Sequence, residues 1–201
     1  DLIANGNNFI LNGTFPTNSS HWTTTPGAVW SANTGDGKSG FVLTRTATNT
    51  FPTILAEKVP AVSGRYYRAV VRMKANVADT VVTVKNSFYN ATDAQPFDVF
   101  DRTVKVGTAW ADYDITWHAS LDGSGADQLS PDGTSYLSLS VGNRAANSVV
   151  SVSSVYLFDD TGGIANSATA GALETLSNEV HQSNTGLSSV SQKIISLNNQ
   201  L

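Results

Sequence analysis

The 201-residue sequence contains no cysteine, so disulfide bonds cannot stabilise it. Cysteine usage therefore does not indicate whether the protein works in a reducing or an oxidising compartment. Charged residues make up only 14% of the chain, and the net charge is −4 with no cluster of Lys or Arg. Because nucleic-acid binding needs a basic footprint, we do not expect it here. The sequence also lacks an apolar run long enough to cross a membrane and the pattern of a signal peptide, so we expect no membrane insertion.

The residue types that are plentiful change along the chain. Ser, Thr, Asn, Gly and Val, which favour strands and turns, dominate before Gly163, whereas helix formers dominate only after Thr169. The length leaves room for one well-cored domain plus a helix. We therefore expect a β domain over residues 1–160, a linker over 161–168 and a helix over 169–201.

Apolar residues in the expected helix recur at alternating spacings of three and four, a period that is typical of a coiled-coil seam. The seam residues are Leu173, Leu176, Val180, Leu187, Val190, Ile194, Leu197 and Leu201. One helix cannot bury such a seam alone, and the mixture of Leu, Val and Ile at the a positions favours more than two strands. We expect a parallel homotrimer. The alternative is an amphipathic helix folded back on its own domain. The abrupt ends at Asp1 and Leu201 lead us to expect a piece of a longer polypeptide.

Short runs with alternating apolar and polar residues fill the first 160 positions, with turn signals between them. The clearest strand is 65–75, where Tyr67, Ala69, Val71 and Met73 share one face. Further strands are expected at 29–32, 41–46, 53–59, 81–89, 99–106, 110–118, 136–141 and 149–158. Roughly nine short strands without a helical period predict an all-β, two-sheet antiparallel sandwich.

Several motifs in this region resemble those of a known family. They are Asn12-Gly13-Thr14-Phe15, Trp22, the stretch 35–43, Ser63-Gly64-Arg65-Tyr66-Tyr67, Trp110-Ala111-Asp112-Tyr113 and the stretch 149–157. In this order they resemble jelly-roll carbohydrate-binding modules of the family 4/9/22 type. The resemblance covers nearly all of 1–160 and implies a galactose-binding-like jelly roll. It also implies that Trp22, Trp110 and Trp117 pack in the core.

The resemblance implies a sugar site on the outer face of the concave sheet, where flat aromatic faces and a few polar groups would bind pyranose rings. The candidate contacts are Trp30, Arg68, Arg72, Lys85 and Tyr89, together with Lys74 on the same face and Phe51 as a flanking aromatic. The alternative is that Trp30 fills the core and that the arginines pair with Asp98 or Asp101.

The resemblance also implies a structural calcium, which the family holds with backbone oxygens of the Gly-rich turn and with acidic residues. Here Pro16 and Ser153 stand where the family has those acidic residues. A hard cation normally needs carboxylates, so the sequence predicts no metal or other cofactor, with Asp159 and Asp160 as the nearest substitutes.

The Ser/Asn-rich heptads of the C-terminal stretch resemble those near the end of host-specificity proteins, the central tail fibre or tail-tip proteins of tailed bacteriophages. Those proteins are trimers at the tip of a virion tail. This second resemblance implies an extracellular, virion-borne protein. Its expected partners are further copies of itself, neighbouring tail proteins and a glycan or receptor on the host-cell surface.

Catalytic patterns are absent from the sequence. His21, His118 and His181 are isolated and none has a metal-ligand spacing with another ligand. There is no Gly-x-Ser-x-Gly elbow, and Asp98 with Asp101 is a weak candidate for a glycosidase pair. We therefore expect no enzyme.

Three functions remain as hypotheses. The first is a non-enzymatic, trimeric module of a phage tail fibre or tail tip that contributes to recognition of the host surface. The second is a structural spacer or decoration domain of the tail fibre that binds no sugar. The third is an accessory carbohydrate-binding module of a secreted polysaccharide hydrolase, which the heptads argue against.

Overall fold

A computed structural model describes residues 8–35, 37–117 and 129–161 of the chain, and eleven β-strands form within these ranges. In chain order they are β1 (Trp22–Thr24), β2 (Ala28–Ser31), β3 (Gly40–Arg45), β4 (Thr53–Ala56), β5 (Val59–Pro60), β6 (Tyr67–Ala75), β7 (Thr80–Tyr89), β8 (Asp98–Val106), β9 (Ala111–Thr116), β10 (Tyr136–Asn143) and β11 (Ser148–Asp159).

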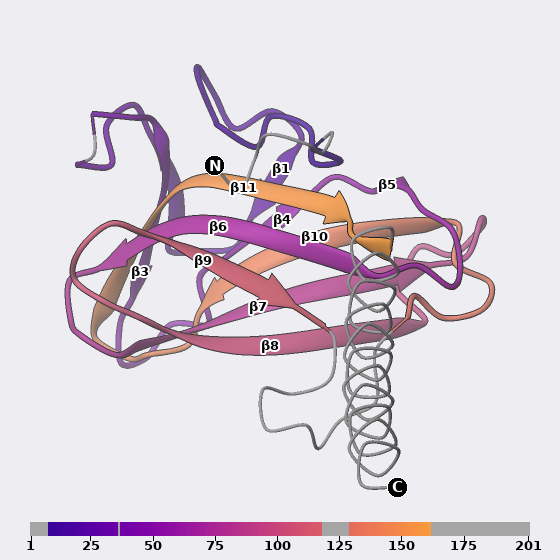
Figure 1. Cartoon of the computed structure of the whole chain (residues 1–201). Coiled ribbons are helices and arrows are strands. Elements are labelled where there is room, and N and C mark those ends of the chain that lie inside the picture. The colour runs from indigo at the N-terminus through magenta and orange to yellow at the C-terminus, as the bar shows by residue number, and fades with distance from the viewer. Residues whose placement is uncertain (1–7, 36, 118–128, 162–201) are drawn as a thin grey trace, which may run out of the picture. The chain divides into compact units, whose positions relative to one another are not determined.

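The strands form two sheets that pack face to face, with β6 and β11 side by side in the nearer layer of Figure 1 and β10 and β7 behind them. Sheet A has the order β1-β4-β10-β7-β8, with β5 also paired to β10. Sheet B has the order β2-β3-β11-β6-β9. All pairings between these strands are antiparallel. The expected all-β, two-sheet antiparallel sandwich is therefore confirmed for the described residues.

Alternation of side chains along each strand builds the core between the sheets. Leu137, Leu139 and Val141 of β10 meet residues such as Val71 and Met73 of β6, and all of them are fully buried. In β11 the alternation changes phase. The register shifts between Val152 and Ser154, so the buried positions pass from Val150 and Val152 to Val155 and Leu157.

Aromatic residues close the end of the core near the first motif. The ring centroid of Phe15 lies 5.2 Å from that of Trp22 and 4.9 Å from that of Phe41, both with edge-to-face geometry. Trp22 and Trp117 are buried core residues, as predicted. The prediction for Trp110 is wrong: it is half-buried and lies outside the core cluster. Its position is out of phase with the buried side chains of β9 that follow it.

The strand predictions differ from the structure in two places. The sequence predicts no strand around Trp22, but Trp22–Thr24 form β1 at one edge of sheet A. The single strand expected at 53–59 is two strands, because the exposed pair Glu57 and Lys58 interrupts the pairing to β10.

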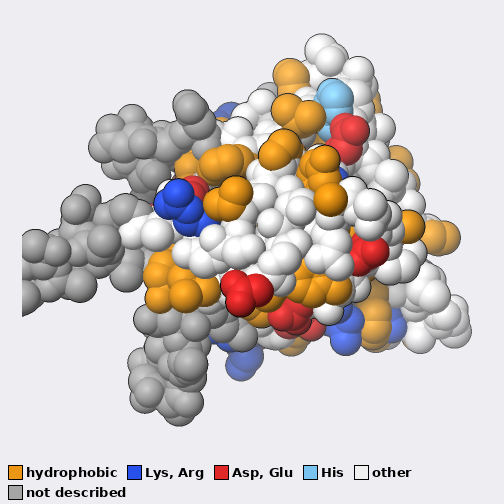
Figure 2. Space-filling view, turned by 90° about the vertical axis from the view of Figure 1, so that its right-hand side faces the viewer, with side chains coloured by type: hydrophobic (Ala, Val, Ile, Leu, Met, Phe, Trp, Pro, Cys, Tyr) orange, Lys and Arg blue, Asp and Glu red, His pale blue; other side chains and the backbone are white. Residues whose placement is uncertain are grey.

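The sandwich belongs to one compact unit, Asp1–Asp160. Several predictions concern residues outside the described ranges and stay predictions. They are the linker beyond Thr161 and the coiled-coil helix over 169–201 with all its seam residues. His118 and His181 also lie outside the described ranges. Over the described ranges, no helix is long and apolar enough to span a membrane. On the side shown in Figure 2, hydrophobic side chains lie in small groups among polar ones, and charges of both signs are interspersed.

Candidate functional site

The outer face of sheet A is hollowed into a groove with a volume of about 470 Å³. Small residues on the middle strands form its floor: Thr53, Thr83, Ser140 and Gly142. Gly142 of β10 pairs with Thr53 of β4 on one side and with Thr83 of β7 on the other. Because Gly142, the central residue of this row, has no side chain, the surface of the sheet is hollowed there. The longer side chains on either side of the row form the walls of the groove.

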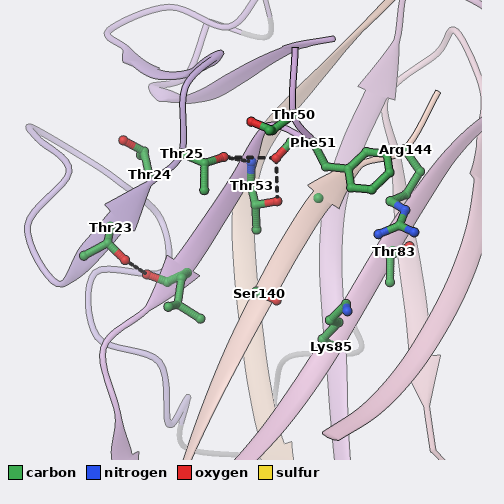
Figure 3. Close-up of a pocket in the computed structure, with 12 residues that line it drawn as sticks. Thr23, Thr24, Thr25, Thr50, Phe51, Thr53, Thr83, Lys85, Ser140 and Arg144 are labelled. Carbon is green, nitrogen blue, oxygen red and sulfur yellow. Dashed lines mark hydrogen bonds between the residues drawn. The ribbon is translucent and has the colours of Figure 1, made fainter. Parts of the chain in front are cut away.

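Phe51 lies at one end of the groove, on the loop that joins β3 to β4. The Thr25 hydroxyl donates to the Phe51 carbonyl at 3.0 Å and accepts the Thr53 amide at 2.8 Å. The Thr53 hydroxyl donates to the same carbonyl at 3.0 Å, as the dashed lines in Figure 3 show. The neighbouring Pro52 carbonyl accepts the Asn143 amide at 2.9 Å. These bonds fix the backbone that carries the aromatic ring.

Two arginines contact the Phe51 ring. The guanidinium carbon of Arg144, just after β10, lies 3.8 Å from the ring centroid, and that of Arg45, at the end of β3, lies 4.1 Å from it. Arg45 Nη1 is shielded from solvent and has no hydrogen-bond partner among the described residues. Figure 3 shows Arg144 beside the ring, with Lys85 further along the groove. Positive charge therefore gathers at the Phe51 end.

The two candidate sugar contacts on β7 have different surroundings. Lys85 lines the groove, and its Nζ lies 3.5 Å from a carboxylate oxygen of Asp101 on β8. Tyr89 is buried, and the Lys58 Nζ lies over its ring at 3.9 Å from the centroid. Burial also raises the pKa of Tyr89. Because an ammonium group stands over the ring, Tyr89 does not offer that ring face to a sugar.

Arg68 and Arg72 lie on the other sheet. The expectation that they share a face with Lys85 is wrong, because β6 pairs within sheet B whereas β7 pairs within sheet A. Arg68 donates from Nε and Nη2 to the two carboxylate oxygens of Asp114 at 2.7 and 2.5 Å, and these hydrogen bonds raise the pKa of Arg68. Arg72 Nη1 lies 3.4 Å from an oxygen of Asp112. Both arginines are thus paired with carboxylates of the neighbouring β9.

Trp30 lies on β2 in sheet B, half-buried and packed against the core. Its indole Nε1 donates to the Phe15 carbonyl at 3.3 Å, and the Ser39 hydroxyl donates to the same carbonyl oxygen. Trp30 therefore ties the first motif to the edge of sheet B and does not line the groove. Lys74 lies on β6 in sheet B, the same strand as Arg68 and Arg72, with its Nζ 5.1 Å from the Trp110 ring centroid.

A second hollow lies where the resemblance implies calcium, lined in part by Pro16, Lys38 and Ser153. The Ser153 hydroxyl is buried and has no hydrogen-bond partner in the described part of the chain. The described residues that line the hollow include no carboxylate and do include the Lys38 ammonium. Asp159 lies at the far end of β11, where it pairs with Arg65 at 3.7 Å. The described residues therefore do not fit a calcium ion, which needs several oxygen ligands with carboxylates among them.

Titratable side chains form few clusters. His21 Nδ1 lies 2.6 Å from a carboxylate oxygen of Glu57, and both residues are exposed. Asp98 and Asp101 lie three apart on β8, where alternation sends their side chains to opposite faces, and Asp101 pairs with Lys85. Among the described residues, no group of three His, Cys, Asp or Glu could hold a metal ion.

The groove contains residues that the sequence interpretation missed. Arg144 and the hydroxyl groups of Thr23, Thr25 and Thr50 line it, and none of them was a candidate. Phe51 was predicted as a flanking aromatic and does line the groove. The threonines that line the groove do not indicate a binding site in the sequence, because Thr is also a common strand residue.

Comparison with known proteins finds similar folds among solved structures. No family model matches the sequence, and the curated proteins contain no match. Among solved structures, a family 16 carbohydrate-binding module has a TM-score of 0.55 at 16% identity, over 76% of this chain and 100% of that chain. The CBM22-1 xylan-binding domain of Paenibacillus barcinonensis Xyn10C has a TM-score of 0.52 at 14% identity, over 77% and 95% of the two chains.

Part of a phage protein has a similar fold. The enzymatically active domain of tailspike protein 4 from bacteriophage CBA120 has a TM-score of 0.53 at 16% identity, over 76% of this chain. This chain spans 21% of that one. Likeness at these identities concerns architecture, and the described β-sandwich thus has the jelly-roll fold of carbohydrate-binding modules.

Proposed function

We propose that this chain is a non-enzymatic glycan-binding module, carried in three copies on a phage tail fibre or tail tip and used in recognition of the host-cell surface. The observation that carries the proposal is the groove on the outer face of sheet A. Its floor of Thr53, Thr83 and Ser140 presents hydroxyl groups that can exchange hydrogen bonds with sugar hydroxyls. Concave sites with a few polar groups are typical of small-ligand binding.

The charged groups of the groove support binding without hydrolysis. A glycosidase places two carboxyl groups on either side of the scissile bond. None of the described residues that line the groove is Asp or Glu. Asp101 lies beside it but is engaged by the Lys85 ammonium. The groove can therefore orient a sugar chain but lacks the acid and base that would cleave it.

The heptads in the sequence support the oligomeric part of the proposal. A seam over Leu173 to Leu201 would assemble three chains, and three grooves on one stalk would bind a repetitive surface glycan with avidity. Tethering raises overall affinity by about 10²–10⁴ over a single site when geometry allows simultaneous binding. The partners would be the host glycan, further copies of the chain and neighbouring tail proteins, in an extracellular setting.

The spacer hypothesis retains one supporting observation. Phe51 is the sole aromatic side chain among the described lining residues, and guanidinium groups already stand over its ring. Modules that bind neutral sugars by stacking need free aromatic faces. A decoration domain that packs on neighbouring tail proteins needs none.

The test is a glycan array, followed by titration of the intact chain with the best ligand. Ser140→Phe would fill the floor of the groove, whereas Thr44→Phe adds the same ring to an exposed strand position of sheet B. We expect Ser140→Phe to weaken binding at least tenfold and Thr44→Phe to leave it unchanged. Equal binding by both variants, or no binding of any glycan or host lipopolysaccharide by the intact chain, would overturn the proposal.

A further inference from the structure

The charge of the groove is unusual for this chain. The protein carries a net charge of −4, and the side shown in Figure 2 mixes both signs. Among the described lining residues, however, the charged side chains are Lys85 and Arg144, and both are cations. Lys85 has a carboxylate partner in Asp101 at 3.5 Å. No described carboxylate lies within ion-pair distance of Arg144, which is exposed.

Arg45 adds a second cation at the same place. Its guanidinium carbon lies 4.1 Å from the Phe51 centroid and that of Arg144 lies 3.8 Å from it, so two like charges share one ring. Cation–π attraction holds each guanidinium, but it neutralises neither. Arg45 donates from Nε to the Thr46 carbonyl at 3.3 Å, and its buried Nη1 donates to no described group. The Phe51 end therefore holds excess positive charge and an unused donor.

The same arrangement disfavours a neutral ligand at this end. A pyranose ring that stacks on an aromatic needs the position over the ring face. Guanidinium carbons about 4 Å from the Phe51 centroid take up that position. A planar guanidinium presents several N–H donors in a fork that matches an oxyanion such as a carboxylate or a phosphate.

We propose that the groove takes an acidic glycan, with Arg144, supported by Arg45 and Phe51, binding an oxyanion on the sugar. This inference rests on the proposed glycan-binding function and narrows its ligand class. The hydrogen bonds from the Thr25 and Thr53 hydroxyls to the Phe51 carbonyl hold the backbone of the residue whose ring contacts both arginines. Hydroxyl groups along the floor would bind the neutral part of the sugar chain, and Lys85 would lie beside it.

The experiment compares charged and neutral partners of one sugar chain on the intact protein. Oligogalacturonate and its methyl ester test a carboxylate, and mannose oligosaccharides with and without 6-phosphate test a phosphate. An array of further carboxylated and phosphorylated glycans, each with a neutral counterpart, widens the search. We expect at least one acidic form to bind about ten to a hundred times more tightly than its neutral counterpart, since a charge-assisted hydrogen bond contributes that range. Added salt should narrow the difference.

Two arginine variants locate the effect. Arg144→Gln should remove the preference for the acidic form, whereas Arg65→Gln, the same change at the turn before β6, should leave it intact. If no acidic form is preferred, or if Arg144→Gln retains the preference, the acidic-glycan inference fails. Loss of neutral-glycan binding in Ser140→Phe would in that case still support the groove as a sugar site. Absence of binding by any glycan would overturn both.

Discussion

Asn143 holds together the corner that presents Arg144. It is fully buried at the end of β10. Its side-chain amide donates to the Leu43 carbonyl in sheet B at 3.1 Å and to the Ser148 carbonyl at 3.2 Å. Its side-chain oxygen accepts the Ala145 amide at 3.1 Å. These bonds join the end of β10 in sheet A, and the loop that leads from it to β11, to sheet B.

Asn143→Ala should therefore destabilise the sandwich strongly. The change leaves at least two buried backbone groups without this partner, and each costs about 1–2 kcal/mol when unsatisfied. We expect a loss of about 3 kcal/mol in the free energy of unfolding. With a denaturant slope of about 2 kcal/mol/M, the urea midpoint should fall by about 1.5 M with little change in slope. Tryptophan fluorescence of the intact chain during urea unfolding measures both.

Asn90→Ala is the matched control. Asn90 is half-buried, and its side-chain amide donates a hydrogen bond to a carboxylate oxygen of Asp93 at 2.6 Å. Its removal should cost about 1.5 kcal/mol or less, because the half-buried Asp93 carboxylate can bond to water instead. If Asn143→Ala costs no more than Asn90→Ala, the hydrogen bonds to Leu43 and Ala145 do not stabilise this corner as argued, and the positioning of Arg144 needs another explanation.

Three further predictions test the core, the buried tyrosines and the seam. Phe41→Ala should cost about 3–5 kcal/mol in urea unfolding, because the ring is fully buried against Phe15, and a loss below about 1 kcal/mol would contradict this packing. Burial raises the pKa of Tyr67 and Tyr89 above their ordinary value of 10.0, so the unfolded chain loses these protons first. Stability should therefore fall as pH rises through about 10 and above, and a urea midpoint that increases there would refute the sign. Sedimentation equilibrium should give three times the mass of one chain, and Ile194→Asp should dissociate it; a monomer at high concentration would sink the predicted trimer.

The strands were predictable because their signal is local. Alternation in 65–75 and 81–89 indicated β6 and β7, and the structure places both strands where the pattern does. β1 carried too little signal: Trp22 is its one buried residue, and the threonines after it show no alternation. The phase change in β11 at Ser153 was invisible in the sequence, because a bulge is decided by the pairing partner.

The site was harder to predict because its residues meet through long-range pairing. Alternation told which side chains of β6 and β7 leave the core, but not that the two strands lie in opposite sheets. Lys85 was a candidate and lines the groove, whereas Arg68 and Arg72 are paired to aspartates on sheet B. Arg144 could not be predicted as a site residue from the sequence. It lies in a loop, and its contact with Phe51, nearly a hundred residues earlier, is visible only in the fold.

The most direct test of the central claim is the location of a bound glycan in a crystal structure of the intact chain with its best-binding ligand. We expect sugar density in the groove over Thr83, Ser140 and Gly142, with an acidic substituent against Arg144. Density on the outer face of sheet B instead, over Arg68 and Arg72, would contradict it.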